Sequence, residues 1–145
     1  EIRNPLIDKY SSIIASIPEV RNIVVNIQRN FGEKPRGKKG IVVDGRDIGT
    51  IIFPNANVKL FISASLEERA KRRFSDFLDK NEKISYNEVI KQLQKRDQRD
   101  KERSVAPLVA AKDAHHIDTT GINIEDTLKI VSSLVIKEFN DYCST

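Results

Sequence analysis

The sequence lacks several features that would assign it to a special class of protein. It has a single cysteine, Cys143, which excludes an internal disulfide framework and fits a reducing cytoplasm. No apolar run approaches the length of a membrane span, and the first residues lack the apolar stretch of a signal peptide. Only 6% of the residues are aromatic and no RNA-binding signature is present. We therefore expect neither a membrane nor a nucleic-acid partner.

Methionine is also absent, even at the first position, so we expect the chain to be a fragment of something longer. What is present is 145 residues, of which 39% are hydrophobic. This indicates a soluble cytoplasmic protein in which residues 1–145 form one domain with a normal core. The 25 Lys and Arg exceed the 21 Asp and Glu by four, and such a modest excess suits a small anionic ligand.

Hydrophobic periodicity predicts helices alternating with strands. Apolar residues recur at helical spacing from residue 5 to 14, after Ser16, after Ser65, after Ser85 and from residue 123 to 139. Each of these serines is followed three residues later by a glutamate, as in a capping box. Short runs rich in β-branched residues predict strands at 41–43, 58–63 and 115–119. The alternation indicates an α/β fold, a parallel sheet wound with helices.

Polarity changes abruptly where the first predicted strand ends, in Asp44-Gly-Arg-Asp47. In an open α/β sheet, ligands bind beyond the carboxyl ends of the strands. A carboxylate, a flexible glycine and an arginine at this place can hold a phosphorylated ligand and a hydrated cation. The alternative interpretation is a strand followed by an ordinary polar turn.

A second concentration of charge occupies residues 95–104. Arg96, Asp100 and Arg103 stand at i, i+4 and i+7, which places all three on one helix face. Two guanidinium groups beside a carboxylate can bind a phosphate and hydrogen-bond to sugar hydroxyls. Spacing alone leaves open the alternative of a solvated helix with surface ion pairs.

Together these motifs resemble bacterial cytidylate kinases, which are nucleoside-monophosphate kinases of the P-loop class. The most specific are Asp44-Gly-Arg-Asp-Ile-Gly-Thr50 and Arg96-Asp-Gln-Arg-Asp100 at this separation. Shorter matching segments occur in the right order, at residues 1–3, 17–21, 53–54, 64–69 and 105–108. The resemblance implies a three-layer αβα kinase core with a parallel sheet and a short helical lid around residues 74–86. It also implies phosphoryl transfer from ATP to CMP or dCMP, with Mg²⁺.

The resemblance assigns expected roles to individual residues. The residues expected to bind CMP are Ser12, Arg21, Arg46, Asp47, Arg96, Asp100 and Arg103. Of these, Arg46 and Arg103 match holders of the phosphate, Arg96 and Asp100 match residues at the ribose, and the others surround the sugar and cytosine. Asp44 matches the acidic residue that orients magnesium through water. The expected catalytic arginines, at the base of a mobile lid, are Arg69, Arg72 and Arg73.

The phosphate loop Gly-x-x-x-x-Gly-Lys-[Ser/Thr] of P-loop kinases is absent from this sequence. We therefore expect the C-terminal part of a cytidylate kinase, inactive alone, without the P-loop strand and most of the CMP-binding subdomain. In the family's sheet that strand lies between 41–43 and 58–63. We expect these two strands to pair directly, another chain to fill the gap by strand exchange, or the missing part to accompany this chain. The alternatives are a kinase for another small phosphorylated substrate and a non-catalytic nucleotide- or RNA-binding module.

Overall fold

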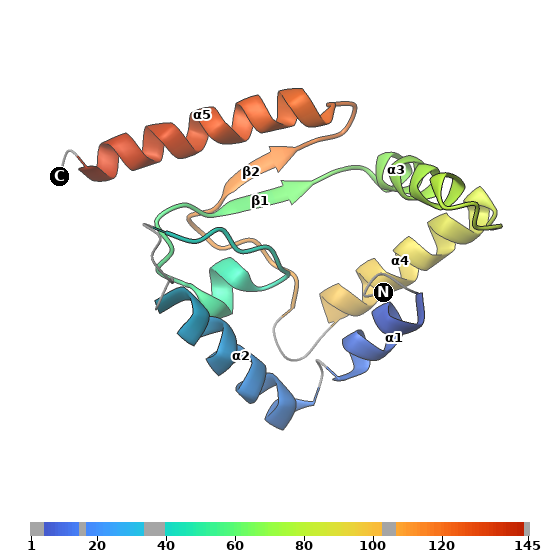
Figure 1. Cartoon of the computed structure of the whole chain (residues 1–145), viewed down its shortest axis with the longest axis horizontal. Coiled ribbons are helices and arrows are strands. Elements are labelled where there is room, and N and C mark those ends of the chain that lie inside the picture. Colours follow the sequence, from blue (N-terminus) through green and yellow to red (C-terminus); the bar gives the residue numbers. More distant parts are fainter. Residues whose placement is uncertain (1–4, 15–16, 34–39, 103–106, 144–145) are drawn as a thin grey trace.

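The computed structural model describes residues 5–14, 17–33, 40–102 and 107–143, and the structural statements that follow concern these. The elements along the chain are α1 (Pro5–Ile14), α2 (Pro18–Glu33), η1 (Ile48–Ile52), β1 (Leu60–Ser63), α3 (Leu66–Asp79), α4 (Tyr86–Glu102), β2 (His115–Asp118) and α5 (Ile124–Cys143). The two strands run between α5 on one side and α2 with η1 on the other, and α3 and α4 form a hairpin beyond one end of the strands (Figure 1).

A parallel sheet joins β1 to β2, as the sequence predicted. Leu60 lies opposite His115 and Ser63 opposite Asp118. The pairing extends one residue beyond each end, because the His115 N–H donates to Lys59 O (2.9 Å) and the Thr119 N–H donates to Ser63 O (2.8 Å). The connection between these parallel strands contains both α3 and α4. The chain is therefore an α/β protein with a small parallel sheet.

Residues 41–43 do not form the predicted strand. Within the described residues the sheet consists of β1 and β2, so direct pairing of residues 41–43 with residues 58–63, one of the three expected arrangements, is wrong. The Val42 side chain is fully exposed. A β-branched run favours an extended backbone, but a strand also needs a neighbour that accepts and donates its ladder of hydrogen bonds. No described neighbour supplies that ladder here.

Local capping signals predicted the starts of the hairpin helices correctly. Ser65 Oγ accepts a hydrogen bond from the Glu68 N–H (3.1 Å) at the start of α3. Ser85 and Glu88 cap α4 reciprocally: the Ser85 N–H donates to Glu88 Oε2 (2.9 Å), and the Glu88 N–H donates to Ser85 Oγ (3.3 Å). Between the helices the chain turns at Asn81, whose φ of 56° is left-handed. The chain is therefore non-helical between the two helices, at residues 80–85.

The clearest apolar cluster in the described chain lies inside the α3–α4 hairpin. Ala70, Phe77 and Val89 are buried there, and the Phe74 and Tyr86 rings meet edge-on at 5.7 Å beside them. Apolar side chains of α2 and α5 are largely exposed by contrast. None of the described helices combines the length and apolar character that a membrane span requires. The hairpin is therefore the best-packed unit in the described structure.

Candidate active site

The Asp44–Thr50 motif begins as an irregular loop and then tightens into η1, a π-helical turn that the sequence did not predict. The Phe53 N–H donates to Ile48 O (2.7 Å), five residues back, and the Ile51 N–H donates to Asp47 O (2.9 Å). Gly45 permits this tight path, because a β-carbon there would come within 2.8 Å of the Ile48 side chain. The motif thus presents Arg46 and Asp47 from a compact turn.

Helix α2 holds this turn at two points. The Arg21 guanidinium donates to the Asp47 carboxylate at one end. At the other end, Arg29 Nη2 donates to Ile51 O (2.7 Å) and Arg29 Nε donates to Ile52 O (3.2 Å). The sequence motifs predicted Arg21 as a site residue, but they did not predict Arg29. Its eight-residue spacing from Arg21, just over two helical turns, was the available signal, since that spacing returns roughly to one helix side.

On α4, a buried carboxylate faces two arginines. The Asp100 side chain is only 4% exposed, and its Oδ2 lies 3.3 Å from Arg46 Nη2 and 4.0 Å from Arg96 Nε. The predicted shared face of Arg96 and Asp100 is therefore observed. Arg46 contacts Asp100 of α4, and the adjacent Asp47 contacts Arg21 of α2. The same turn therefore contacts both helices. The group contains three arginines against two aspartates, which leaves a net charge of +1 with the buried Asp100 included.

The three expected lid arginines do not converge on one point. Arg69 donates from Nη1 and Nη2 to the two carboxylate oxygens of Asp97 at 2.9 and 2.8 Å, and from Nε to Ala64 O at 3.1 Å. Hydrogen bonding to Asp97 raises the pKa of the Arg69 guanidinium, against the opposing effect of partial burial. Asp97 lies inside the Arg96–Asp100 motif, although its position there predicted no role for it.

Arg72 and Arg73 make quite different contacts. Arg72 joins α3 to the turn after β2: it donates to Thr119 O (2.7 Å), Thr119 Oγ1 (3.2 Å) and Ile122 O (3.2 Å), and also to Glu68 on its own helix. Arg73 instead places its guanidinium carbon 4.9 Å from the centre of the Phe77 ring. Arg72 therefore fixes the carboxyl edge of the sheet, where ligands of open α/β sheets bind.

The sequence as a whole matches one family of known proteins. A family model described as cytidylate kinase matches residues 1–137. The chain belongs to the cytidylate kinase family. It is 44% identical over 137 residues to the curated cytidylate kinase of Fusobacterium nucleatum subsp. nucleatum, covering 94% of this chain and 61% of that protein. It is 45% identical over 129 residues to that of Shewanella pealeana, covering 89% and 54% respectively. The chain thus spans little more than half the length of these cytidylate kinases.

Family membership confirms the resemblance noted in the motifs, while the roles of single residues stay predictions. Among the residues expected to bind CMP, the structure brings together Arg21, Arg46, Asp47, Arg96 and Asp100. Arg103 is not among the residues that the structure describes, and neither is the side chain of Ser12, whose backbone belongs to α1. Asp44 is exposed at the start of the turn. Most of the predicted nucleotide-binding group therefore occupies one region.

Proposed function

We propose that the protein to which this chain belongs transfers a phosphoryl group from ATP to CMP or dCMP, forming CDP or dCDP. The observation that carries this proposal is the approach of Arg46 and Arg96 to the buried Asp100, at 3.3 and 4.0 Å. This arrangement offers Arg46 as a cationic donor for a phosphate, next to Arg96 as a donor and Asp100 as an acceptor for sugar hydroxyls. Phosphoryl transfer depends mainly on such positioning and on positive charge around the moving group.

Each polar residue of this region then has a role toward the nucleoside monophosphate. Arg46 and Arg103 hold the CMP phosphate, for which a planar guanidinium can supply two parallel hydrogen bonds. Arg96 and Asp100 contact the ribose. Ser12, together with the ion pair of Arg21 and Asp47, lines the sugar and the cytosine. The pairing of Arg21 with Asp47 supports this, because it orients both groups before any ligand arrives.

The expected Mg²⁺ fits the acidic residues that are available. Within the described part of the chain no three His, Cys, Asp or Glu residues gather as a closed metal site. Mg²⁺ does not need such a cage, because it keeps several waters and binds through one or two carboxylates and the substrate phosphates. The exposed Asp44 carboxylate would hold it through water. When bound, the ion would offset negative charge on the phosphates of ATP.

We extend the proposal to the domain, lid and sheet of the complete kinase. Residues 1–145 would form one domain, the C-terminal part of a P-loop kinase with a three-layer αβα core. Residues 74–86, at the tip of the α3–α4 hairpin, would belong to the lid, and Arg69, Arg72 and Arg73 would lie toward its base. Closing the lid would exclude water from the reacting phosphates. The sheet would accept a further strand, either within the complete protein or by strand exchange with another chain.

A direct test uses the complete gene product and measures CDP formed from ATP, Mg²⁺ and CMP. We expect turnover on the order of 1 to 100 per second. UMP and AMP serve as competing acceptors, and a preference for either would favour the alternative of a kinase for another small phosphorylated substrate. Binding of a short RNA that weakens steeply between two salt concentrations, without cytosine-specific nucleotide binding, would favour the non-catalytic module.

The isolated 145-residue chain should form no CDP under the same conditions. Its sequence has no phosphate loop, so the backbone N–H groups and the lysine that hold the phosphates of ATP are not supplied. Turnover by the isolated chain at an ordinary kinase rate would show that this reasoning is wrong.

A further inference from the structure

The α3–α4 hairpin is closed at its base by a charged clasp between Arg69 and Asp97. Arg69 lies in the first turn of α3, and Asp97 lies in the second half of α4. Two parallel N–H···O bonds of 2.9 and 2.8 Å join them, one to each carboxylate oxygen. This end-on geometry fixes the direction of the guanidinium as well as its position.

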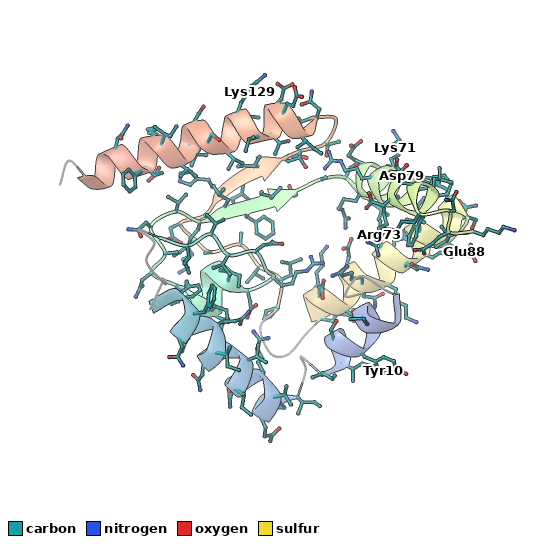
Figure 2. All side chains as sticks on the ribbon, viewed as in Figure 1. Tyr10, Lys71, Arg73, Asp79, Glu88 and Lys129 are labelled. Carbon is teal, nitrogen blue, oxygen red and sulfur yellow. The ribbon has the colours of Figure 1, made fainter. Side chains whose placement is uncertain are left out.

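The clasp and the apolar cluster make the hairpin one packed unit. Phe77 and Val89 are buried between the helices, and the capped turn of Ser85 and Glu88 closes the far end, which Figure 2 shows at Glu88, away from the strands. A packed unit of this kind moves as a body, so its movement would be taken up where it joins the rest of the protein. Arg69 lies at such a junction, because it donates to the carbonyl of Ala64, the residue that follows β1.

The contacts of Arg69 leave part of its guanidinium available to a ligand. Asp97 and the Ala64 carbonyl together engage three N–H groups. A guanidinium has five, and within the described residues no contact uses the remaining two. The side chain is about one-third exposed. The orientation of these two donors is therefore set by Asp97.

We infer that Asp97 is a positioning residue, which holds Arg69 in the orientation that presents one of its two remaining N–H groups to the phosphates of the nucleoside triphosphate. This inference rests on the proposed function, since it assumes that Arg69 faces the phosphoryl donor. Asp97 itself does not touch the nucleotide. Its carboxylate fixes the fork geometry of the arginine, and a neutral or shorter side chain at position 97 cannot make the same pair of charged bonds.

The test compares steady-state kinetics of complete gene products that carry wild-type, D97N, D97E, R69A and D97N/R69A sequences. With CMP saturating, D97N should lower kcat/KM for ATP by about 10- to 100-fold, as expected for a misplaced group near the reaction. The KM for CMP should stay within about twofold of the wild type, because the Asp97 carboxylate contacts Arg69 and not the residues expected to bind CMP. D97E, which keeps the charge, should recover part of the loss. In the R69A background, D97N should add less than about twofold, because the two side chains act through one interaction.

A matched control is D113N, which removes the carboxylate of another charged bond between distant segments, Lys59 to Asp113 at 2.6 Å. It should leave kcat/KM for ATP within about twofold of the wild type. The inference is overturned if D97N merely lowers the melting temperature and keeps kcat/KM for ATP, or if the effects of D97N and R69A multiply. A wild-type protein without any CMP kinase activity would overturn the proposed function and this inference together. An active wild type with an unaffected D97N overturns this inference alone.

Discussion

Replacing Asp100 by asparagine removes the one carboxylate to which two site arginines are drawn. Arg46 and Arg96 both approach the same oxygen, Oδ2, at 3.3 and 4.0 Å. Asparagine has nearly the same size, so the packing around this buried position is kept while the charge is lost. The substitution can also place an amide N–H₂ group opposite the N–H donors of the two arginines, which then lack an acceptor at this position.

The size of the effect follows from the exposure of the three side chains. Removing one partner of a fully buried ion pair costs about 3–5 kcal/mol, because the other charge is left buried. Here the arginine side chains are 39% and 45% exposed and can turn to water, whereas Asp100 is 4% exposed. We therefore expect D100N to lower the free energy of unfolding by about as much as the loss of a hydrogen bond to a charged group, which is about 1–3 kcal/mol.

Denaturant unfolding gives the stability change, and titration with CMP and with cytidine gives the effect on binding. If Asp100 contacts the ribose, D100N weakens both ligands by a similar factor. R46A should instead weaken CMP far more than cytidine, because its proposed partner is the phosphate. The control is E102Q, the same charge change on the same helix at an exposed position. A D100N protein that matches E102Q in both stability and CMP affinity would refute the reasoning.

Three further substitutions test other parts of the structure. R29A removes two hydrogen bonds to the π-helical turn, and it should raise the KM for CMP more than that for ATP; equal effects on both would contradict a local role. F77A removes a side chain that is 5% exposed in the hairpin cluster, and it should cost about 3–5 kcal/mol in denaturant unfolding; a loss below about 1 kcal/mol would contradict the packing. Hydrogen bonds from Ser85 lower the pKa of Glu88 below its ordinary 4.5, so Glu88 stabilises the fold above that pH and loses its effect as the pH falls through the lowered value. The difference in free energy of unfolding between wild type and E88Q should therefore disappear in acid. A difference that is unchanged between about pH 7 and pH 3 would contradict the stabilising role of the Ser85–Glu88 cap.

Helix starts could be predicted from the sequence because they depend on a few neighbouring residues. Ser65 and Ser85 cap α3 and α4 through residues three positions away, and both contacts are observed. Strand 115–119 was also predicted within one residue, and it forms because β1 lies beside it. The run at 41–43 has the same β-branched character, but it has no such neighbour among the residues that the structure describes. A strand is a property of a pair of segments, and composition alone shows only one of them.

The candidate site was predictable where its residues share one helix or one turn. Arg96 and Asp100 are four residues apart on α4, and Arg46 and Asp47 are adjacent in a single motif. The contacts between elements were not predictable in this way. Arg69 meets Asp97 across 28 positions, and Arg72 meets Thr119 across 47. Each of these contacts depends on how the hairpin lies against the strands, which spacing along the chain does not encode.

Amphipathic spacing has a related limit, which α2 illustrates. Val20, Ile23, Val24, Ile27 and Phe31 recur at the helical period, and this correctly predicted a helix. The period indicates that one face is apolar, but it does not identify what that face contacts. In the structure Phe31 is 73% exposed and Ile27 is 62% exposed, while two arginines of the same helix make the hydrogen bonds to the π-helical turn. The residues that place α2 at the site are therefore Arg21 and Arg29, and not the apolar stripe by which the helix was recognised.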